Sequence, residues 1–466
     1  MDKFFKITER GSNVKTEIIA GLTTFFAMAY IIVVNPNQIV GFSFDVPGVG
    51  KIWNAVYIAS IIAAVIGTLL YAFYAKLPFA QACGMGLNSF FFTSFVLPQI
   101  ISGGDVIKGY QAGLVIILLS GVVFMILSIT GLRSYIAKAM PECIKKAISA
   151  GIGLFIAFIG FQNVGIIQAN QYTLVQFVKI NGAAWKDIAP AIIALLGFII
   201  IAVLAKLKVK GAVLIGIGAT TVIYYLATWQ VPSFDLSSIA QPFKDFAEIG
   251  ITGVFKAESW TNAFGGEMIG GIFSVIMLIV TFCLVDMFDT IGTLYGTASE
   301  ADMLDENGDP IDIDKSMTCD SVATCAGAVL GTSTVTTFVE SASGVAAGGR
   351  TGLTSLVTSL CFIACLFLSP IAGVIPSAAT APALIFVGVL MLKNFSKVDM
   401  TDMRSAVPAF LALIMMPLTY SIANGIGIAS IAYVLITLFT GKYQKKDITV
   451  SIIAALFICK FVFGTM

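Results

Sequence analysis

Histidine is missing from all 466 residues of the chain. The side chain that most often binds metals or acts as a general base near neutral pH is therefore excluded. The 8 cysteines are scattered in or beside apolar runs and include no Cys-x-x-Cys pair, which argues against a zinc site or a disulfide framework. No cofactor or metal ion is expected, and any proton transfer must use carboxylates, lysine, tyrosine or water.

Charged residues are also scarce, at 11% of the chain, where soluble proteins average about 25%. Hydrophobic residues make up 58%, and the mean hydropathy is +0.95. Such a composition cannot cover a folded surface in water, but it suits a surface in contact with lipid. The net charge of +1 gives no reason to expect nucleic acid as a partner. Residues 1–16 are polar and contain no apolar stretch of the kind that a cleavable signal peptide needs.

Many apolar runs approach the length of a membrane-spanning helix, which is about 20 residues. The clear candidates are 17–35, 52–75, 111–130, 145–162, 188–205, 211–229, 272–298, 353–375, 377–393, 404–421 and 424–441. Three weaker segments, 79–98, 318–331 and 332–350, raise the prediction to about fourteen crossings. The tail, 448–466, is apolar but contains Lys460, so both a spanning and a surface position are compatible with it. The predicted fold class is an all-α polytopic membrane protein.

Basic residues cluster between particular segments, and such clusters mark the cytoplasmic side of a cell membrane. The clusters are Lys3, Lys6, Arg10 and Lys15; Arg133, Lys138, Lys145 and Lys146; Lys206, Lys208 and Lys210; Lys393, Lys397 and Arg404; and Lys442, Lys445 and Lys446. All of them fall on one side only if every weak segment also crosses. The pattern therefore predicts a cytoplasmic N-terminus in the cytoplasmic membrane.

Similar stretches recur in the two halves of the chain, which predicts an internal repeat. Phe79-Ala80-Gln81 resembles Phe338-Val339-Glu340, and each follows a Gly-Thr pair. In this alignment Gln81 and Glu340 occupy matching positions. A second similarity relates Met140-Pro141 to Ile375-Pro376. Because seven crossings per half is an odd number, the two halves must be inverted relative to each other.

The segment 332–350 is unusually polar for a membrane crossing. Its first part is rich in threonine and valine, which favour a strand, and Ser341, Ser343 and Gly344 favour the start of a helix. The stretch around Gly84 follows the same pattern. Strand backbone at membrane depth requires shelter inside protein or beside a water-filled cavity. We expect two broken helices whose N-termini face one site at the midplane. The alternative, an extramembrane loop at 332–350, breaks the alternation of charge.

Three carboxylates lie where apolar side chains are the rule. Asp286 is near the middle of the segment 272–298, Asp289 lies three residues further on the same helix face, and Glu340 is at the predicted strand-to-helix break. An acid at membrane depth costs about 2.5–3.5 kcal/mol on insertion scales, so it usually marks a substrate or proton path. The alternative is that these acids accept hydrogen bonds from serine, threonine or helix ends and hold the bundle together.

Other candidate residues have ordinary structural explanations beside the functional one. Asn88 is either a helix N-cap or a ligand contact. Several aromatic rings can stack on a flat ligand or serve only to pack the core and contact lipid. These are Phe25, Phe26, Tyr30, Phe79 and Phe338.

Four stretches, in order along nearly the whole chain, resemble the AzgA-like purine permeases of the nucleobase–cation symporter group, which includes uracil and xanthine permeases. They are Glu9–Tyr30, Gly84–Asn88, Asp286–Thr293 and Gly331–Gly344. The resemblance implies two inverted seven-helix repeats with short strands in the broken third and tenth helices. It also implies proton-coupled purine uptake by an elevator-like movement of a core against a gate. The core is 1–132 (helices one to four) and 231–375 (eight to eleven), and the gate is 133–230 (five to seven) and 376–466 (twelve to fourteen and the tail).

The same resemblance assigns roles to residues. Asp286 and Glu340 match the family's substrate-binding acids, and Asp289 and Asn88 match supporting positions. The predicted substrate-binding residues are Asp286, Glu340, Asn88, Phe79, Phe338, Gly84 and Ser341, and the predicted proton-coupling residues are Asp286, Asp289 and Glu340. Which acid binds the purine and which takes the proton is left open. The expected partners are a purine, with hypoxanthine and guanine favoured over adenine, a proton and the lipid bilayer; a homodimer is considered beside a monomer.

Two alternatives compete with a purine symporter. A carrier of another nucleobase, such as uracil or xanthine, or of an anion can have the same architecture, although an anion carrier would more naturally present arginine or lysine at the broken helices. An intramembrane enzyme is the second alternative, but the sequence contains neither His-Glu-x-x-His nor Gly-x-Ser-x-Gly. A catalytic aspartate pair would also face each other from separate helices, whereas Asp286 and Asp289 share one.

Overall fold

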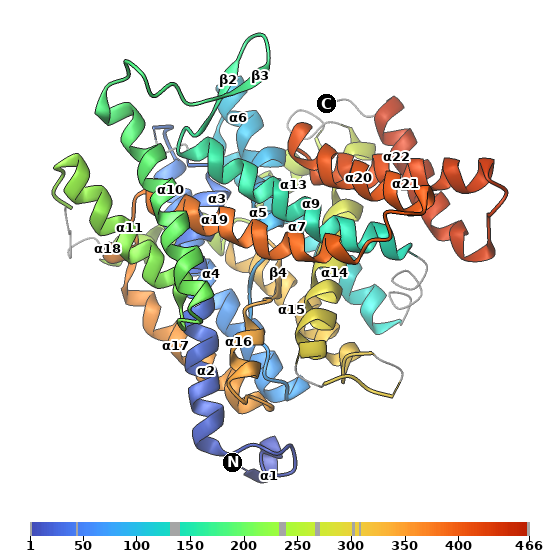
Figure 1. The fold of residues 1–466 in the computed structure, drawn as a ribbon, viewed down its shortest axis with the longest axis horizontal. Coiled ribbons are helices and arrows are strands. Elements are labelled where there is room, and N and C mark those ends of the chain that lie inside the picture. The colour runs from blue at the N-terminus through green and yellow to red at the C-terminus, as the bar shows by residue number, and fades with distance from the viewer. Residues whose placement is uncertain are drawn as a thin grey trace.

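The computed structural model describes residues 2–42, 45–130, 140–232, 239–265, 271–300, 303–306 and 309–463 (Figure 1). Among these residues, nine helices are long and apolar enough to cross a membrane. They are Val14–Ile39, Val49–Ala75, Met85–Ser102, Val106–Ile129, Glu142–Asn163, Trp185–Lys206, Ile272–Tyr295, Ser377–Lys397 and Ile422–Phe439. Shorter apolar helices are Ala212–Thr228, Gly352–Phe367, Met403–Leu418 and Ile448–Val462. The prediction of a helical polytopic protein is confirmed, and Arg133 and Lys138 of the basic clusters lie outside the described residues.

The first half of the chain begins with a helix that is interrupted at Tyr30. Its elements are α1 (Asp2–Phe5), α2 (Val14–Met28), α3 (Ile31–Ile39), α4 (Val49–Leu70), η1 (Tyr71–Ala75), β1 (Gln81–Cys83), α5 (Met85–Phe91), η2 (Phe92–Val96), α6 (Leu97–Ser102), α7 (Val106–Ile129), α9 (Glu142–Asn163), β2 (Ile167–Asn170), β3 (Leu174–Phe177), α10 (Trp185–Lys206) and α11 (Ala212–Thr228). The exposed hairpin β2–β3 was not predicted, because its two short strands contain no long apolar run that would mark them in the sequence.

The second half repeats this order after a stretch of short helices. Its elements are α12 (Ala240–Asp245), η4 (Phe246–Gly250), α13 (Ala257–Phe264), α14 (Ile272–Glu300), α15 (Ile313–Leu330), β4 (Val335–Thr337), α16 (Ser341–Ala346), α17 (Gly352–Ala364), η5 (Cys365–Phe367), α18 (Ser369–Ala372), α19 (Ser377–Leu392), η6 (Lys393–Lys397), α20 (Met403–Leu418), α21 (Ile422–Phe439), η7 (Lys445–Asp447) and α22 (Ile448–Phe463). The broken third and tenth segments are confirmed as β1–α5 and β4–α16.

Strands β1 and β4 pair with each other in antiparallel register, with Ala82 opposite Thr336. All residues of both strands are buried. The ladder is extended symmetrically at its ends, where the Gly84 amide donates to the Thr334 carbonyl and the Phe338 amide donates to the Ala80 carbonyl, both at 3.0 Å. Antiparallel pairing of equivalent strands is the arrangement that two inverted halves produce. An extramembrane loop at 332–350 is therefore wrong, because its strand lies inside the bundle.

The register corrects one detail of the predicted repeat. Gln81 lies in β1 opposite Thr337, whereas Glu340 lies three residues beyond the end of β4. The two residues therefore do not occupy matching positions. The alignment rested on a short similarity between the flanking residues. Such a similarity cannot fix the register of paired strands, because the register depends on contacts between residues that are distant in sequence.

The second similarity corresponds to a real structural equivalence. Pro141 and Pro376 are the N-cap residues of α9 and α19. The two helices lie side by side (Figure 1). Their backbones meet at glycines, since a Cβ atom added at Gly388 would lie 2.5 Å from the Gly153 carbonyl oxygen. This close approach of equivalent helices joins the two halves.

The helices divide into two packed groups, each built from both halves. One group contains α2, α4, α7, α14, α15, α16 and α17, and the other contains α9, α10, α11, α19, α20 and α21. Helix α22, the predicted tail, packs against α21 and touches α14. At about 1.5 Å per residue its 16 residues extend about 24 Å, less than the hydrocarbon core of about 30 Å.

Candidate functional site

The strand pair β1–β4 is the centre of the candidate site, and equivalent threonines hold its two strands. The Thr68 hydroxyl of α4 accepts from the Gln81 amide at 3.0 Å. The Thr324 hydroxyl of α15 accepts from the Val335 amide at 3.1 Å. Backbone groups at membrane depth need partners within the protein, and these threonines provide them.

Asp286 lies on α14 beside the strand pair and is 1% exposed. Its Oδ2 atom accepts a hydrogen bond from the Thr324 hydroxyl at 2.8 Å. Its Oδ1 atom is buried and has no hydrogen-bond partner among the described residues. The carboxylate is thus held at one oxygen, and its other oxygen remains a free acceptor.

Glu340, between β4 and α16, has a similar environment. Its Oε1 atom accepts from the Tyr30 hydroxyl at 2.5 Å. Tyr30 is 1% exposed and lies at the interruption between α2 and α3. The Oε2 atom is buried and has no partner in the described part of the chain. Tyr30, considered from the sequence as either a stacking or a packing ring, also donates its hydroxyl to this acid.

Asp289 and Asp320 bring the number of acids at the site to four. Asp289 is half-buried on the same face of α14 as Asp286. Asp320 on α15 acts on both of these aspartates electrostatically, and Glu340 acts on Asp289. None of the salt bridges described for the chain includes these acids. Across the described residues, no three acids or cysteines are arranged to hold a metal ion.

Asp320 is the functional candidate that the sequence interpretation missed. It is fully buried and accepts hydrogen bonds from both strands and two further helices. The donors are the Gln81 side-chain amide, the Thr290 hydroxyl, the Tyr71 hydroxyl at 3.3 Å, and the Thr337 amide and hydroxyl at 3.1 and 2.9 Å. An acid inside the predicted crossing 318–331 is the same signal that identified Asp286, and it would have found Asp320.

Asn88 joins a second polar cluster, with Ser333 and Gln38. It is fully buried; its Oδ1 accepts from the Ser333 hydroxyl, and its Nδ2 donates to Gln38 Oε1 at 3.2 Å. The N-cap of α5 is Gly84, so the N-cap interpretation of Asn88 is wrong. A helix-start asparagine suggests an N-cap from sequence, but here it lies in the first turn and binds side chains. Gln38 and Ser333 were not predicted.

The remaining predicted site residues build the strand pair and its surroundings. The Ser341 hydroxyl accepts from the Ala80 amide at 3.0 Å, and the Gly84 amide completes the ladder. Phe79 is buried and packs edge-to-face on Tyr71, with ring centroids 5.8 Å apart. Phe338 is 5% exposed next to β4. Direct contact of these four residues with a substrate remains a prediction.

The other aromatic candidates, Phe25 and Phe26, lie on α2. Phe25 packs on Phe362 at 5.3 Å, and Phe26 is 46% exposed on the outer surface. Packing and lipid contact account for both rings.

Comparison with known proteins identifies the class. The permease family matches residues 15–428, so the chain belongs to the permease family. It is 40% identical to guanine/hypoxanthine permease PbuG of Bacillus subtilis, over 99% of this chain and 100% of the relative. It is 36% identical to adenine permease AdeP of Escherichia coli, over 99% and 96% of the two chains, and 37% identical to a putative permease of Methanocaldococcus jannaschii, over 99% and 98%.

Solved structures confirm the architecture. The transmembrane domain of the cyanobacterial bicarbonate transporter BicA aligns with a TM-score of 0.59 at 14% identity, over 88% of this chain and 97% of that chain. The inward-facing murine anion transporter Slc26a9 aligns with a TM-score of 0.60 at 12% identity, over 92% and 69%. These likenesses concern the two-repeat fold alone. Together with the family, they define a multi-pass membrane transporter and not an enzyme.

Proposed function

We propose that this permease imports purine nucleobases together with protons, and that Asp286 and Glu340 bind the purine. The observation that carries the proposal is that both acids lie beside the strand pair with one buried oxygen each that has no partner among the described residues. A purine is flat and neutral and has N–H donors along its edge. These N–H groups can donate hydrogen bonds to the carboxylate oxygens that have no partner. Such charge-assisted hydrogen bonds are about twice as strong as neutral ones.

The names of the relatives support the substrate class. Two of them are a guanine/hypoxanthine permease and an adenine permease, at 40% and 36% identity over nearly the whole chain. We favour hypoxanthine and guanine over adenine for this protein. The runner-up is another nucleobase, such as uracil or xanthine. The four acids at the site disfavour an inorganic anion as substrate, because they would repel it. In none of the described salt bridges does a basic residue neutralise one of these acids.

Proton coupling is proposed from the same acids. Asp289 and Asp320 act electrostatically on Asp286, and Asp320 and Glu340 act on Asp289. Their mutual repulsion favours uptake of a cation, and acids at membrane depth commonly form proton paths. Asp286, Asp289 and Glu340 are the proposed proton-coupling residues, since Asp320 is occupied by other hydrogen bonds.

The transport movement is proposed to be elevator-like. The two packed helix groups support a core, 1–132 and 231–375, that carries the acids and slides against a gate, 133–230 and 376–466. The basic clusters favour the cytoplasmic membrane, with the N-terminus in the cytoplasm.

Uptake into proteoliposomes tests the proposal. Labelled hypoxanthine, guanine, adenine and uracil are offered with and without an inward proton gradient. We expect gradient-stimulated accumulation of the purines and none of uracil. Uptake of uracil without uptake of purines would show that the substrate is uracil and not a purine. Purine uptake that is the same with and without the proton gradient would exclude proton coupling. No uptake of any of the four would leave only the permease fold.

A further inference from the structure

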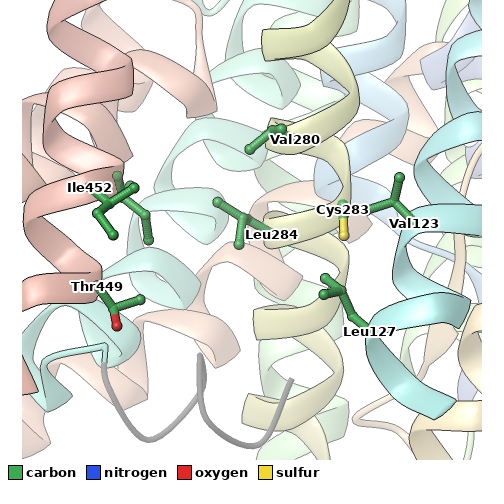
Figure 2. A pocket seen from close by; sticks show the side chains of 8 residues that line it. Val123, Leu127, Val280, Cys283, Leu284, Thr449 and Ile452 are labelled. Atoms are coloured by element: carbon green, nitrogen blue, oxygen red, sulfur yellow. The ribbon is translucent and has the colours of Figure 1, made fainter. Parts of the chain in front are cut away.

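An apolar groove runs along the outer surface of the bundle between α7, α14 and α22 (Figure 2). Val123 and Leu127 of α7, Val280 and Leu284 of α14, and Thr449 and Ile452 of α22 line it. Figure 2 shows the α22 side chains on one side, the α7 side chains on the other, and α14 between them. The groove therefore joins the C-terminal helix to two helices of the proposed core.

The groove opens outward, since Val123 is 36% and Ile452 is 57% exposed. Water gains almost no hydrogen bonds there, because Thr449 is the lone hydroxyl among the lining side chains. In a membrane-spanning chain such a surface is covered by hydrocarbon. The length of α22, about 24 Å, exceeds the half-bilayer depth of about 15 Å that one acyl chain spans.

Positive charge gathers at the Thr449 end of the groove. Lys442 and Lys445 are exposed on the turn that leads into α22. The Arg404 guanidinium lies beside them and donates to the Lys442 carbonyl at 3.5 Å. Asp447, the acid of this turn, is 1% exposed and accepts from the Tyr433 hydroxyl and the Gln444 amide, so it points away from solvent.

We propose that the groove holds one acyl chain of an anionic phospholipid of the cytoplasmic leaflet, whose phosphate binds Lys442, Lys445 and Arg404. Charge complementarity selects this occupant, because anionic lipids enrich the cytoplasmic leaflet and each nearby basic residue contributes about 1 kcal/mol. Neither Asp286 nor Glu340 lines the groove, so the proposal does not depend on which substrate is carried.

Native mass spectrometry of the full-length protein tests the site, with phosphatidylglycerol and phosphatidylcholine titrated separately. We expect phosphatidylglycerol to be retained in preference. Lys442→Gln with Lys445→Gln should weaken its retention on the order of 10-fold or more. The matched control is Lys206→Gln with Lys208→Gln, which removes the same charge from the exposed end of α10 and the turn after it and should leave retention unchanged.

A second variant fills the groove without changing charge. Ile452→Trp should displace the retained phosphatidylglycerol, whereas Leu438→Trp, on an outward position of α21 that is 51% exposed, should not. Size-exclusion profiles matching the parent protein establish that both variants fold. Equal retention of the two lipids, or unchanged retention in Ile452→Trp, would overturn the proposal. So would a lipid-free dimer that Ile452→Trp dissociates, since a second copy would then cover the groove.

Discussion

Asp320 and Asp286 are buried carboxylates on adjacent helices, yet their surroundings differ. Both oxygens of Asp320 are occupied by donors from four other residues. Asp286 has a single donor, Thr324, and its second oxygen is unpartnered within the described residues. Glu340 is like Asp286, with Tyr30 as its donor. Leaving a buried polar atom without a hydrogen bond costs about 1–3 kcal/mol of folding free energy. Such an atom is therefore expected where a bound ligand supplies the missing hydrogen bond. This difference supports a structural role for the saturated acid, Asp320, and the proposed ligand-binding role for Asp286 and Glu340.

Asp286→Asn and Glu340→Gln should break this comparison most strongly. Each substitution replaces one carboxylate oxygen, which accepts hydrogen bonds, by an NH₂ group, which donates them. The oxygen replaced is either the one without a partner or the one that Thr324 or Tyr30 already donates to. We expect uptake of the preferred purine to fall on the order of 100-fold or more, because a charge-assisted hydrogen bond is lost and a repulsive contact is gained. Initial rates in proteoliposomes measure this, normalised to the amount of reconstituted protein.

Glu258→Gln is the control for these variants, since Glu258 pairs with Lys108 at an exposed position away from the site. It should retain uptake close to the parent. Parent-like uptake in either acid variant would remove that residue from the binding site.

Asp320→Asn should act on folding before it acts on transport. Its NH₂ group would replace one of the two accepting oxygens and would oppose either the Thr337 amide or the Gln81 side chain, both of which are donors, leaving that donor unpaired at about 1–3 kcal/mol. We expect less protein in the membrane and a lower thermal unfolding temperature in detergent. A variant with parent-like stability but no uptake would instead place Asp320 among the ligand-binding acids.

Tyr30→Phe should have a smaller, local effect. It removes the hydroxyl that donates to Glu340 and keeps the buried aromatic ring. A hydrogen bond to a charged group contributes about 1.5–3 kcal/mol, so we expect apparent purine affinity to weaken on the order of 10-fold. Competition uptake measures the change. An unaltered KM would mean that Glu340 is positioned without Tyr30.

Thr324→Val and Thr68→Val sharpen the comparison with the smallest change. The two threonines support equivalent strands, but only Thr324 also donates to an acid. Both variants should lose similar stability, about 1–3 kcal/mol for the unpaired strand amide. Only Thr324→Val should also lower uptake, by several-fold at equal protein amounts. Equal losses of uptake in the two variants would show that Thr324 acts through the strand alone.

Local chemistry explains which parts of this molecule were predictable. The broken tenth segment follows from the threonine and valine run at 332–339, which is unsuited to a lipid-facing helix, and Asp286 follows from its position in an apolar run. Partner choice was not predictable, because it depends on contacts distant in sequence. The pairing of Gln81 with Thr337 and the cluster of Asn88, Gln38 and Ser333 are of this kind. Asp320 was overlooked although its signal was local.

The strand pair also sets the order in which the protein can mature. The Gln81 side chain and its acceptor Asp320 are 239 residues apart, and Tyr71 and Thr337 are 266 apart. At a synthesis rate of about 5–20 residues per second, β1 emerges on the order of 10 to 50 seconds before its partners exist. During that interval its polar backbone must stay with the insertion machinery or with water. The first half of the chain thus enters the membrane early, but its strand β1 can complete its hydrogen bonds only after the second half has been synthesised.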